Sequence, residues 1–252
     1  NLNDPLPVQY FKYLVNLLQG NFGESFSGRP VWDEIMQAFP VTFRLALIAI
    51  IFEIVIGISA GILAALNRGG FWDNLVLIST LIVISIPVFV IGFLAQFTFG
   101  IKLGWFPPTV GPNATVYELL LPAFVLASLS LAYVARLMRA NLTENLRADY
   151  VRTATSKGLS RQRVIGRHAV RNSLIPVVTF IGADFGALLG GAIVTEGIFN
   201  IRGIGGLLYL SIRTREGATV VGVVTVLVLV FLLVNLLVDI LYGAIDPRIR
   251  YE

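Results

Sequence analysis

The feature that most constrains the fold of this chain is a series of five long apolar runs. Each is close to or above the roughly 20 residues that an α-helix needs to cross a bilayer. Charged residues make up only 13% of the sequence, against about 25% in soluble domains. The sequence therefore predicts an all-α, polytopic bundle of five membrane helices, at Val41–Leu66, Leu75–Ile101, Leu119–Met138, Ser173–Thr195 and Thr219–Gly243. Pro87 lies inside the second run, where we expect it to kink a continuous helix.

The distribution of Lys and Arg predicts the orientation of this bundle. One side of the membrane receives the turn after Leu66, the segment 139–172 and the tail 244–252, which together carry eleven basic residues. The other side carries six. Because basic loops stay on the cytoplasmic side, we expect residues 1–40 to be extracytoplasmic. Residues 41–243 then form the transmembrane domain, with a cytoplasmic loop at 139–172 and a cytoplasmic tail.

The polar stretch Asp149–Pro176 is the longest interruption between apolar runs. Asp149 is a candidate N-cap for a helix over Tyr150–Lys157, which Gly158 would end in a left-handed conformation. Ser160 would cap a second helix over Arg161–Asn172. Two short helices joined by a glycine hinge form a platform on which a cytoplasmic partner could dock. The alternative is a solvated basic loop that only fixes the orientation.

Acidic residues inside the apolar runs are candidates for function. A charge at the centre of a bilayer costs about 2.5–3.5 kcal/mol on insertion scales, so such a group should face water or a partner. We expect Asp184 to line a translocation pathway, and Glu53 is the second candidate. The alternative is a protonated or capped acid within a helix interface.

Small residues recur at helical spacing in two of the runs. They would allow close helix packing, and they are Gly57 and Gly61 in the first run and Gly182, Gly186 and Gly190 in the fourth. The first pair also matches the G-x-S-x-G pattern of hydrolases. That chemistry needs a strand–turn–helix context and a histidine partner, and the only histidine lies in the distant polar loop.

Composition also argues against a catalytic or metal centre in this chain. It has no cysteine and a single histidine, so thiolate sites and sites that need two histidines are excluded. No G-x-x-x-x-G-K-[ST] sequence occurs, so the chain lacks the loop that binds ATP phosphates. We expect no metal and no cofactor in this chain, and no enzymatic activity.

The polar stretch resembles the cytoplasmic "EAA" loop of ABC importer permeases of the dipeptide, oligopeptide and nickel group. The resemblance rests on Tyr150-Val151-Arg152-Thr153-Ala154, Lys157-Gly158-Leu159 and Leu174-Ile175-Pro176. Arg152-Thr153-Ala154 stands where the name-giving Glu-Ala-Ala would be. Further landmarks are Ala64–Gly70, Ser85-Ile86-Pro87, Leu103–Pro108, Gly203-Ile204-Gly205 and Asp246-Pro247-Arg248. Arg202 departs from the family, which usually has Pro before Gly-Ile-Gly, and this leaves the loop Glu196–Gly217 open.

The resemblance implies a type I ABC importer permease in a bacterial inner membrane, with a sixth helix before Asn1. It would form the path for di- or oligopeptides together with a homologous second permease and an extracytoplasmic binding protein. ATP and Mg would be bound by two cytoplasmic ATPase subunits. Their contact would comprise Tyr150, Val151, Arg152, Thr153, Ala154, Lys157, Gly158 and Leu159, with Tyr150, Val151 and Ala154 presenting apolar surface.

Three alternatives remain open on the sequence alone. One is nickel as the substrate of the same kind of importer. The second is a secondary transporter that uses the intramembrane acids as an ion relay. The third is an intramembrane enzyme, which the lone histidine disfavours.

Overall fold

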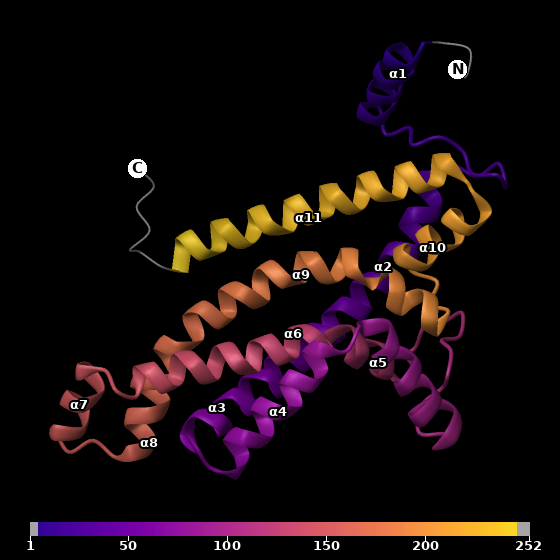
Figure 1. Cartoon of the computed structure of the whole chain (residues 1–252). Coiled ribbons are helices and arrows are strands. Elements are labelled where there is room, and N and C mark those ends of the chain that lie inside the picture. The colour runs from indigo at the N-terminus through magenta and orange to yellow at the C-terminus, as the bar shows by residue number, and fades with distance from the viewer. Residues whose placement is uncertain (1–4, 246–252) are drawn as a thin grey trace.

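The computed structural model of the protein describes residues 5–245, which form helices joined by loops (Figure 1). Four helical stretches are long and apolar enough to cross a membrane, and a bent helix pair could form a fifth crossing. These stretches are Val31–Leu66, Val116–Asn145, Arg161–Gly190 and Gly217–Val238, with Phe71–Ser85 and Val88–Lys102 as the bent pair. The predicted membrane helix bundle is therefore present.

The first span begins ten residues earlier than the sequence predicted. It consists of α2 (Val31–Phe52), a π-helical segment η1 (Glu53–Gly57) and α3 (Ile58–Leu66). Pro30 occupies the N-cap position, and acidic residues in the first turn complement the positive end of the helix dipole. The early turns are amphipathic, and their buried residues, Val31, Ile35 and Ala38, pack in a cluster with residues of α10 and α11.

The second run is broken rather than kinked, so the predicted continuous helix is wrong. α4 (Phe71–Ser85) and α5 (Val88–Ala95), which continues as η2 (Gln96–Lys102), meet at an angle of 104°. Ile86 is extended, with ψ of 128°, because a residue before proline disfavours the helical region. Pro87 also lacks the N–H that would continue the helical hydrogen bonds.

Three long helices complete the bundle: α6 (Val116–Asn145), α9 (Arg171–Phe199) and α11 (Gly217–Ile245). α6 is the most buried of the long helices and packs against α2, α3, α4, α5 and α9. It starts with a capping box in which Thr115 and Glu118 satisfy each other's backbone N–H groups. The predicted second loop helix Arg161–Asn172 does not end before Pro176. α8 (Arg161–Arg163), η3 (Val164–Val170) and α9 run on without a break.

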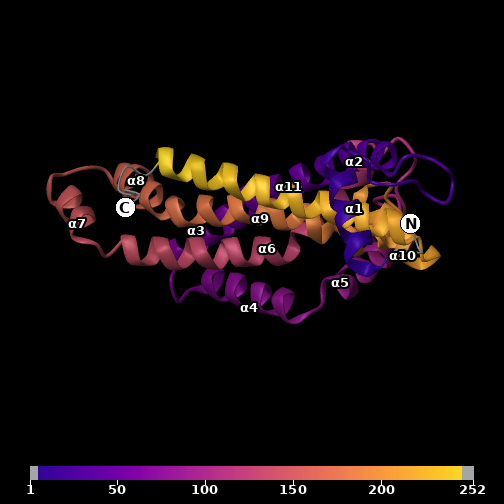
Figure 2. The same cartoon turned by 90° about the horizontal axis from the view of Figure 1, so that it is seen from above.

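The polar segments gather at two opposite ends of the bundle, as Figure 2 shows. One end, here called the α7 end, contains α7 (Asp149–Ser156), α8 and the end of α11. The other, the α10 end, contains α1 (Leu6–Leu18), α10 (Ile204–Thr214) and the start of α2. This alternation agrees with the loop order that the apolar runs predict. α10 lies within the segment Glu196–Gly217, which the sequence predicted only as a loop. Residues 246–252, with the landmark Asp246-Pro247-Arg248, lie outside the described residues.

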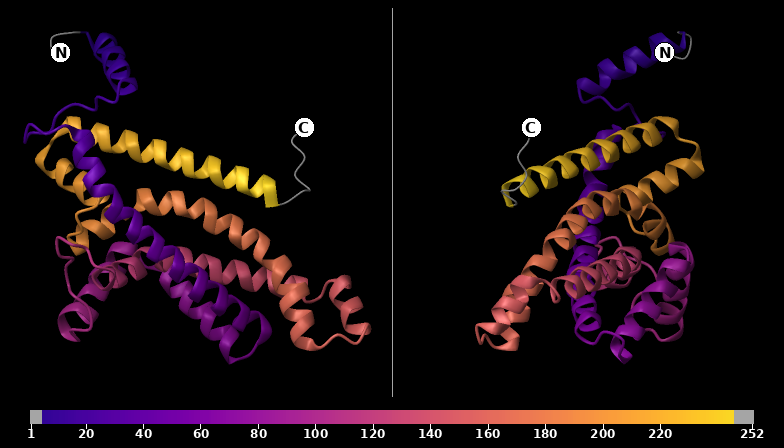
Figure 3. Two further views of the ribbon diagram at one scale, coloured as in Figure 1. Left: turned by 180° about the vertical axis from the view of Figure 1, so that it is seen from behind. Right: turned by 60° about the vertical axis from the view of Figure 1, so that its left-hand side comes forward.

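Four of the five small residues lie at close helix contacts. A Cβ atom at Gly61 would lie 2.6 Å from the backbone oxygen of Ala135 on α6, and one at Gly57 would lie 2.8 Å from Val134. In α9, which runs beside α11 in both views of Figure 3, Gly182 and Gly186 face Val238 and Phe231 of α11. Gly190 has open space where a Cβ would be.

Candidate functional site

The α7 end is built around a short helix that is anchored from beneath. α7 follows α6 directly and folds back onto η3. Val151 and Ala154 are each only 5% exposed, and they belong to one apolar cluster with Val164 of η3 and Met138 and Leu142 of α6. Because these buried side chains fix α7 to α6 and to the helix that continues from η3 into α9, a force on α7 would be transmitted to both.

This packing corrects the expected contact surface. Val151 and Ala154 face the inside of the subunit and do not present apolar surface to a partner, because their cluster uses that apolar face. Tyr150 remains 39% exposed and donates a hydrogen bond from its hydroxyl to Asn145 Oδ1. Leu159 is half-buried, and the exposed side of the segment is polar: Arg152, Thr153, Thr155, Ser156, Lys157 and Gly158.

The ends of α7 differ in part from the predicted caps. The helix begins at Asp149, one residue early, with Ala148 at the N-cap position and no side-chain cap. Asp149 forms a long, exposed ion pair with Arg152 at 3.7 Å, of a kind that contributes little to stability. Ser160 does precede α8, but it makes no capping hydrogen bond.

Gly158 has the predicted left-handed backbone, with φ of +76° and open space around its Cα. Gly158→Val should therefore cost about 1–2 kcal/mol locally and turn η3 away from α7. We expect lower substrate-stimulated ATP turnover by the assembled transporter, and Gly158→Asn should restore it because Asn tolerates this conformation. Gly166→Val is the matched control, since Gly166 is exposed, has open space and no positive φ. Full turnover in Gly158→Val would show that the hinge lies elsewhere.

The two intramembrane acids that the sequence singled out differ in how deeply they are buried. Asp184 on α9 is half-buried, whereas Glu53 on η1 is fully buried at 0% exposure. Glu53 is enclosed by its own subunit here, and its segment η1 packs against α6. Its expected place in the pathway stays a prediction. Asp184 keeps its expected role as a proposal.

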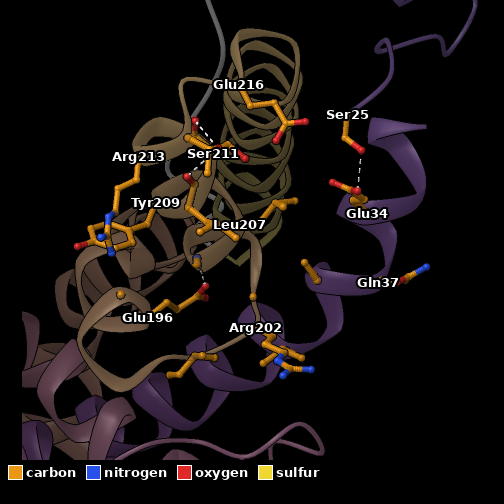
Figure 4. Close-up of a pocket in the computed structure, with 18 of the residues that line it drawn as sticks. Ser25, Glu34, Gln37, Glu196, Arg202, Leu207, Tyr209, Ser211, Arg213 and Glu216 are labelled. Atoms are coloured by element: carbon orange, nitrogen blue, oxygen red, sulfur yellow. Dashed lines mark hydrogen bonds between the residues drawn. The ribbon is translucent and has the colours of Figure 1, made fainter. Parts of the chain in front are cut away.

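A cleft of about 880 Å³, which was not predicted from the sequence, opens at the α10 end (Figure 4). It lies between the start of α2 and α10, whose residues are more than 150 positions apart in the chain. Charged side chains of both signs line it: Arg29, Glu34, Glu196, Arg202, Arg213 and Glu216. Arg202 is exposed here, so its departure from the family pattern places a cation in the cleft wall and leaves the loop intact.

A buried network of hydrogen bonds, here called the polar knot, holds α10 in place beneath this cleft. It consists of Thr42, Glu196 and the backbone N–H groups of Ile204 and Gly206. Thr42 of α2 donates to Glu196 Oε1 at 2.6 Å and accepts from the backbone N–H of Ile204 at 2.8 Å. The N–H of Gly206 donates to Glu196 Oε2 at 2.7 Å. Two of the unpaired N–H groups at the start of α10 are thereby satisfied by side chains from α2 and α9.

The knot explains the landmark Gly203-Ile204-Gly205 and the glycine that follows it. A Cβ at Gly203 would lie 2.5 Å from both Glu196 oxygens, and one at Gly206 would lie 2.1 Å from the Ile201 carbonyl oxygen. A Cβ at Gly205 would lie 2.6 Å from the Ile193 backbone. No side chain fits at these three positions while the knot is intact.

Glu196→Ala should destabilise the α10 end by about 3 kcal/mol, because it leaves two buried donors without an acceptor. The change would appear as a lower unfolding temperature of the assembled transporter and faster proteolysis of the loop after α9. Glu144→Ala serves as the control, since Glu144 is an exposed acid near the end of α6. Equal unfolding temperatures for the two variants would contradict a structural role for the knot.

Comparison with known proteins identifies the family. A family model described as "binding-protein-dependent transport system inner membrane component" matches residues 57–251. The oligopeptide transport system permease protein OppB of Haemophilus influenzae is 40% identical over 256 residues, covering 100% of this chain and 83% of the relative. The di/tripeptide transport system permease protein DppB of Pseudomonas aeruginosa is 40% identical over 278 residues, with the same coverages. The glutathione transport system permease protein GsiC of Escherichia coli K12 is 41% identical over 252 residues, covering 100% and 82%.

The fold also matches a solved importer. A chain of the MetNI methionine ABC transporter in an inward-facing conformation superposes with a TM-score of 0.70 at 16% identity, over 84% of this chain and 96% of that one. A chain of an amino acid ABC transporter gives a TM-score of 0.61 at 15% identity, over 84% and 94%. The expected ABC importer permease fold is confirmed.

These matches confirm the family resemblance and weigh against the secondary transporter and the intramembrane enzyme. Family membership implies a binding protein and ATPase subunits as partners, with ATP bound by the ATPases. The chain belongs to the binding-protein-dependent transport system inner membrane components, and it is a non-catalytic, multi-pass permease subunit of an ABC importer.

Proposed function

We propose that this subunit forms, with a homologous second permease, the membrane path for di- and oligopeptides. The observation that carries the substrate class is the full-length similarity to permeases named for oligopeptides, for di- and tripeptides and for glutathione. All three substrate classes contain a peptide backbone. Nickel, which the sequence left open, is the alternative substrate.

The α7 end faces the cytoplasm and the α10 end faces outwards in this proposal. Support comes from the excess of Lys and Arg in the segments on the α7 side, which the positive-inside rule places in the cytoplasm. The binding protein would then release its substrate at the α10 end, where the charged cleft lies. Asp184, half-buried on α9, would line the path between the two ends.

The exposed polar side of α7 is the contact for an ATPase subunit. Arg152 and Lys157 would pair there with acidic groups of the ATPase, and Thr153 and Ser156 would pack beside them. When ATP draws two ATPases together, each contact moves with its ATPase. Because Val151 and Ala154 anchor α7 to α6 and η3, the long helices would follow as rigid bodies and switch the path from inward- to outward-facing.

Transport by purified components tests the substrate class. Liposomes are prepared with the permease pair, the ATPases and the binding protein, and ATP is either enclosed in them or added outside. The uptake of a labelled dipeptide, a labelled pentapeptide and nickel is then measured. We expect ATP-dependent peptide uptake that needs the binding protein. ATP-dependent uptake of nickel alone would overturn the peptide proposal and leave the permease role intact.

A further inference from the structure

Three helices bring polar side chains together in the middle of the bundle. Glu53 lies on η1, Ser130 on α6 and Asp184 on α9, and both η1 and α9 pack against α6. Glu53 is fully buried and Ser130 is 9% exposed. The Ser130 hydroxyl donates a hydrogen bond to the Asp184 carboxyl group, and the Glu53 and Asp184 carboxyl groups lie within hydrogen-bonding reach of each other.

Three carboxyl oxygen atoms of this cluster lack a hydrogen-bond donor. Neither carboxyl oxygen of Glu53, nor Oδ2 of Asp184, has a hydrogen-bond partner in the part of the chain that the structure describes. No Lys or Arg among the described residues pairs with either acid, and the titratable groups that meet here are these two alone. Two facing carboxylates without a counter-charge would repel each other strongly in the buried interior of the bundle, where water does not screen them.

One bound proton resolves this conflict. A carboxylic acid donates to a carboxylate, so the same two groups that repel when both are ionised form a strong hydrogen bond when they share a proton. A metal ion fits less well, because no group of three or more His, Cys, Asp and Glu residues that could hold one occurs in the described residues.

We propose that Glu53 and Asp184 form a proton-binding site within the membrane, in which one proton is held between the two carboxyl groups. The shared proton ties the first span to α9. The Ser130 hydroxyl orients the Asp184 carboxyl group. Because the Asp184 side chain is only half-buried, the proton can exchange with water at its exposed part. If α9 moved away from η1, the two carboxyl groups could no longer share the proton. They would then release it to water, or each group would have to bind a proton of its own.

Infrared spectroscopy of the assembled transporter in lipid tests the site directly. Glu53→Gln and Asp184→Asn each supply an amide donor in place of the proton, so each should remove a carbonyl band of a protonated carboxylic acid from the spectrum at neutral pH. Ser130→Ala should keep the band and shift its frequency, because the pair loses one hydrogen bond. Asp33→Asn, at an exposed acid of α2, should leave the band unchanged. Glu196 also has a buried carboxyl group, and any band from it would remain in every variant.

If Glu53→Gln and Asp184→Asn both keep every carboxylic-acid band of the native transporter, or if the native transporter has no such band, the proposal is overturned. If neither variant assembles, the native transporter is treated at neutral pH with a hydrophobic carbodiimide, which reacts with protonated carboxyl groups. A mass-spectrometric adduct at Glu53 or Asp184 would support the shared proton. Adducts at other acids of the chain and at neither of these two would contradict it.

Discussion

Reversing both exposed charges of α7, in Arg152→Glu with Lys157→Glu, should lower substrate-stimulated ATP turnover by about tenfold or more. Truncating one partner of a charge pair that becomes buried and hydrogen-bonded in an interface costs about 2–5 kcal/mol, and about 1.4 kcal/mol is already a factor of ten in binding. Reversal adds repulsion to that loss. Both side chains are exposed and neither belongs to the apolar cluster below α7, so the subunit itself should fold normally.

The measurement is ATP turnover by the reconstituted transporter with and without loaded binding protein. Lys102→Glu is the matched control, because Lys102 is an exposed cation that follows the second apolar run and is not part of α7. We expect that control to keep its stimulation. If the double reversal keeps normal turnover and normal association with the ATPases, α7 is not the contact surface.

Gly61→Val should be the most destabilising single substitution within the membrane. A Cβ there would lie 2.6 Å from both the Ala135 backbone oxygen and Met138 Cβ, and backbone atoms of α6 have no rotamer by which to move away. Overpacking in a core typically costs about 1–3 kcal/mol and occasionally more. We expect the upper end of that range, because α3 and α6 must move apart along the whole contact.

The unfolding temperature of the purified subunit complex measures this effect. Gly190→Ala is the control, since no atom outside its own helix turn lies within 4 Å of a Cβ at Gly190. It should leave the unfolding temperature unchanged or raise it slightly, because alanine limits the unfolded chain more than glycine does. Comparable losses in Gly61→Val and Gly190→Ala would show that the close α3–α6 contact has no special energetic weight.

The sequence predicted the existence of the membrane helices better than their shape. Apolar length is a strong signal, so the five runs were found. It carries little information on where a helix starts, because the first turns of α2 are amphipathic and bury only Val31, Ile35 and Ala38. Pro87 was recognised, but whether a proline kinks a helix or ends it depends on the packing around it. The short α10 is held by the knot between Thr42 and Glu196, whose partners are 154 positions apart, and no local pattern reports such a contact.

The candidate site was predictable to a similar degree. The left-handed Gly158 followed from its place after a short helical pattern, since few other residues take that conformation. The inward direction of Val151 and Ala154 did not follow, because the two are three positions apart on one helix face and either a partner or the subunit itself could cover that face. The charged cleft and the contact of Glu53 with Asp184 depend on helices from distant parts of the chain.

Isolation of the full-length protein from its native membrane in mild detergent, with mass spectrometry of the proteins that accompany it, tests the central claim most directly. We predict ATPase subunits and a second, homologous permease in the native sample. The ATPases should be lost when residues 150–159 are scrambled at all positions except the buried Val151 and Ala154, which keep α7 anchored. A protein that is recovered alone or only with copies of itself, and whose transport survives depletion of ATP, would contradict the account.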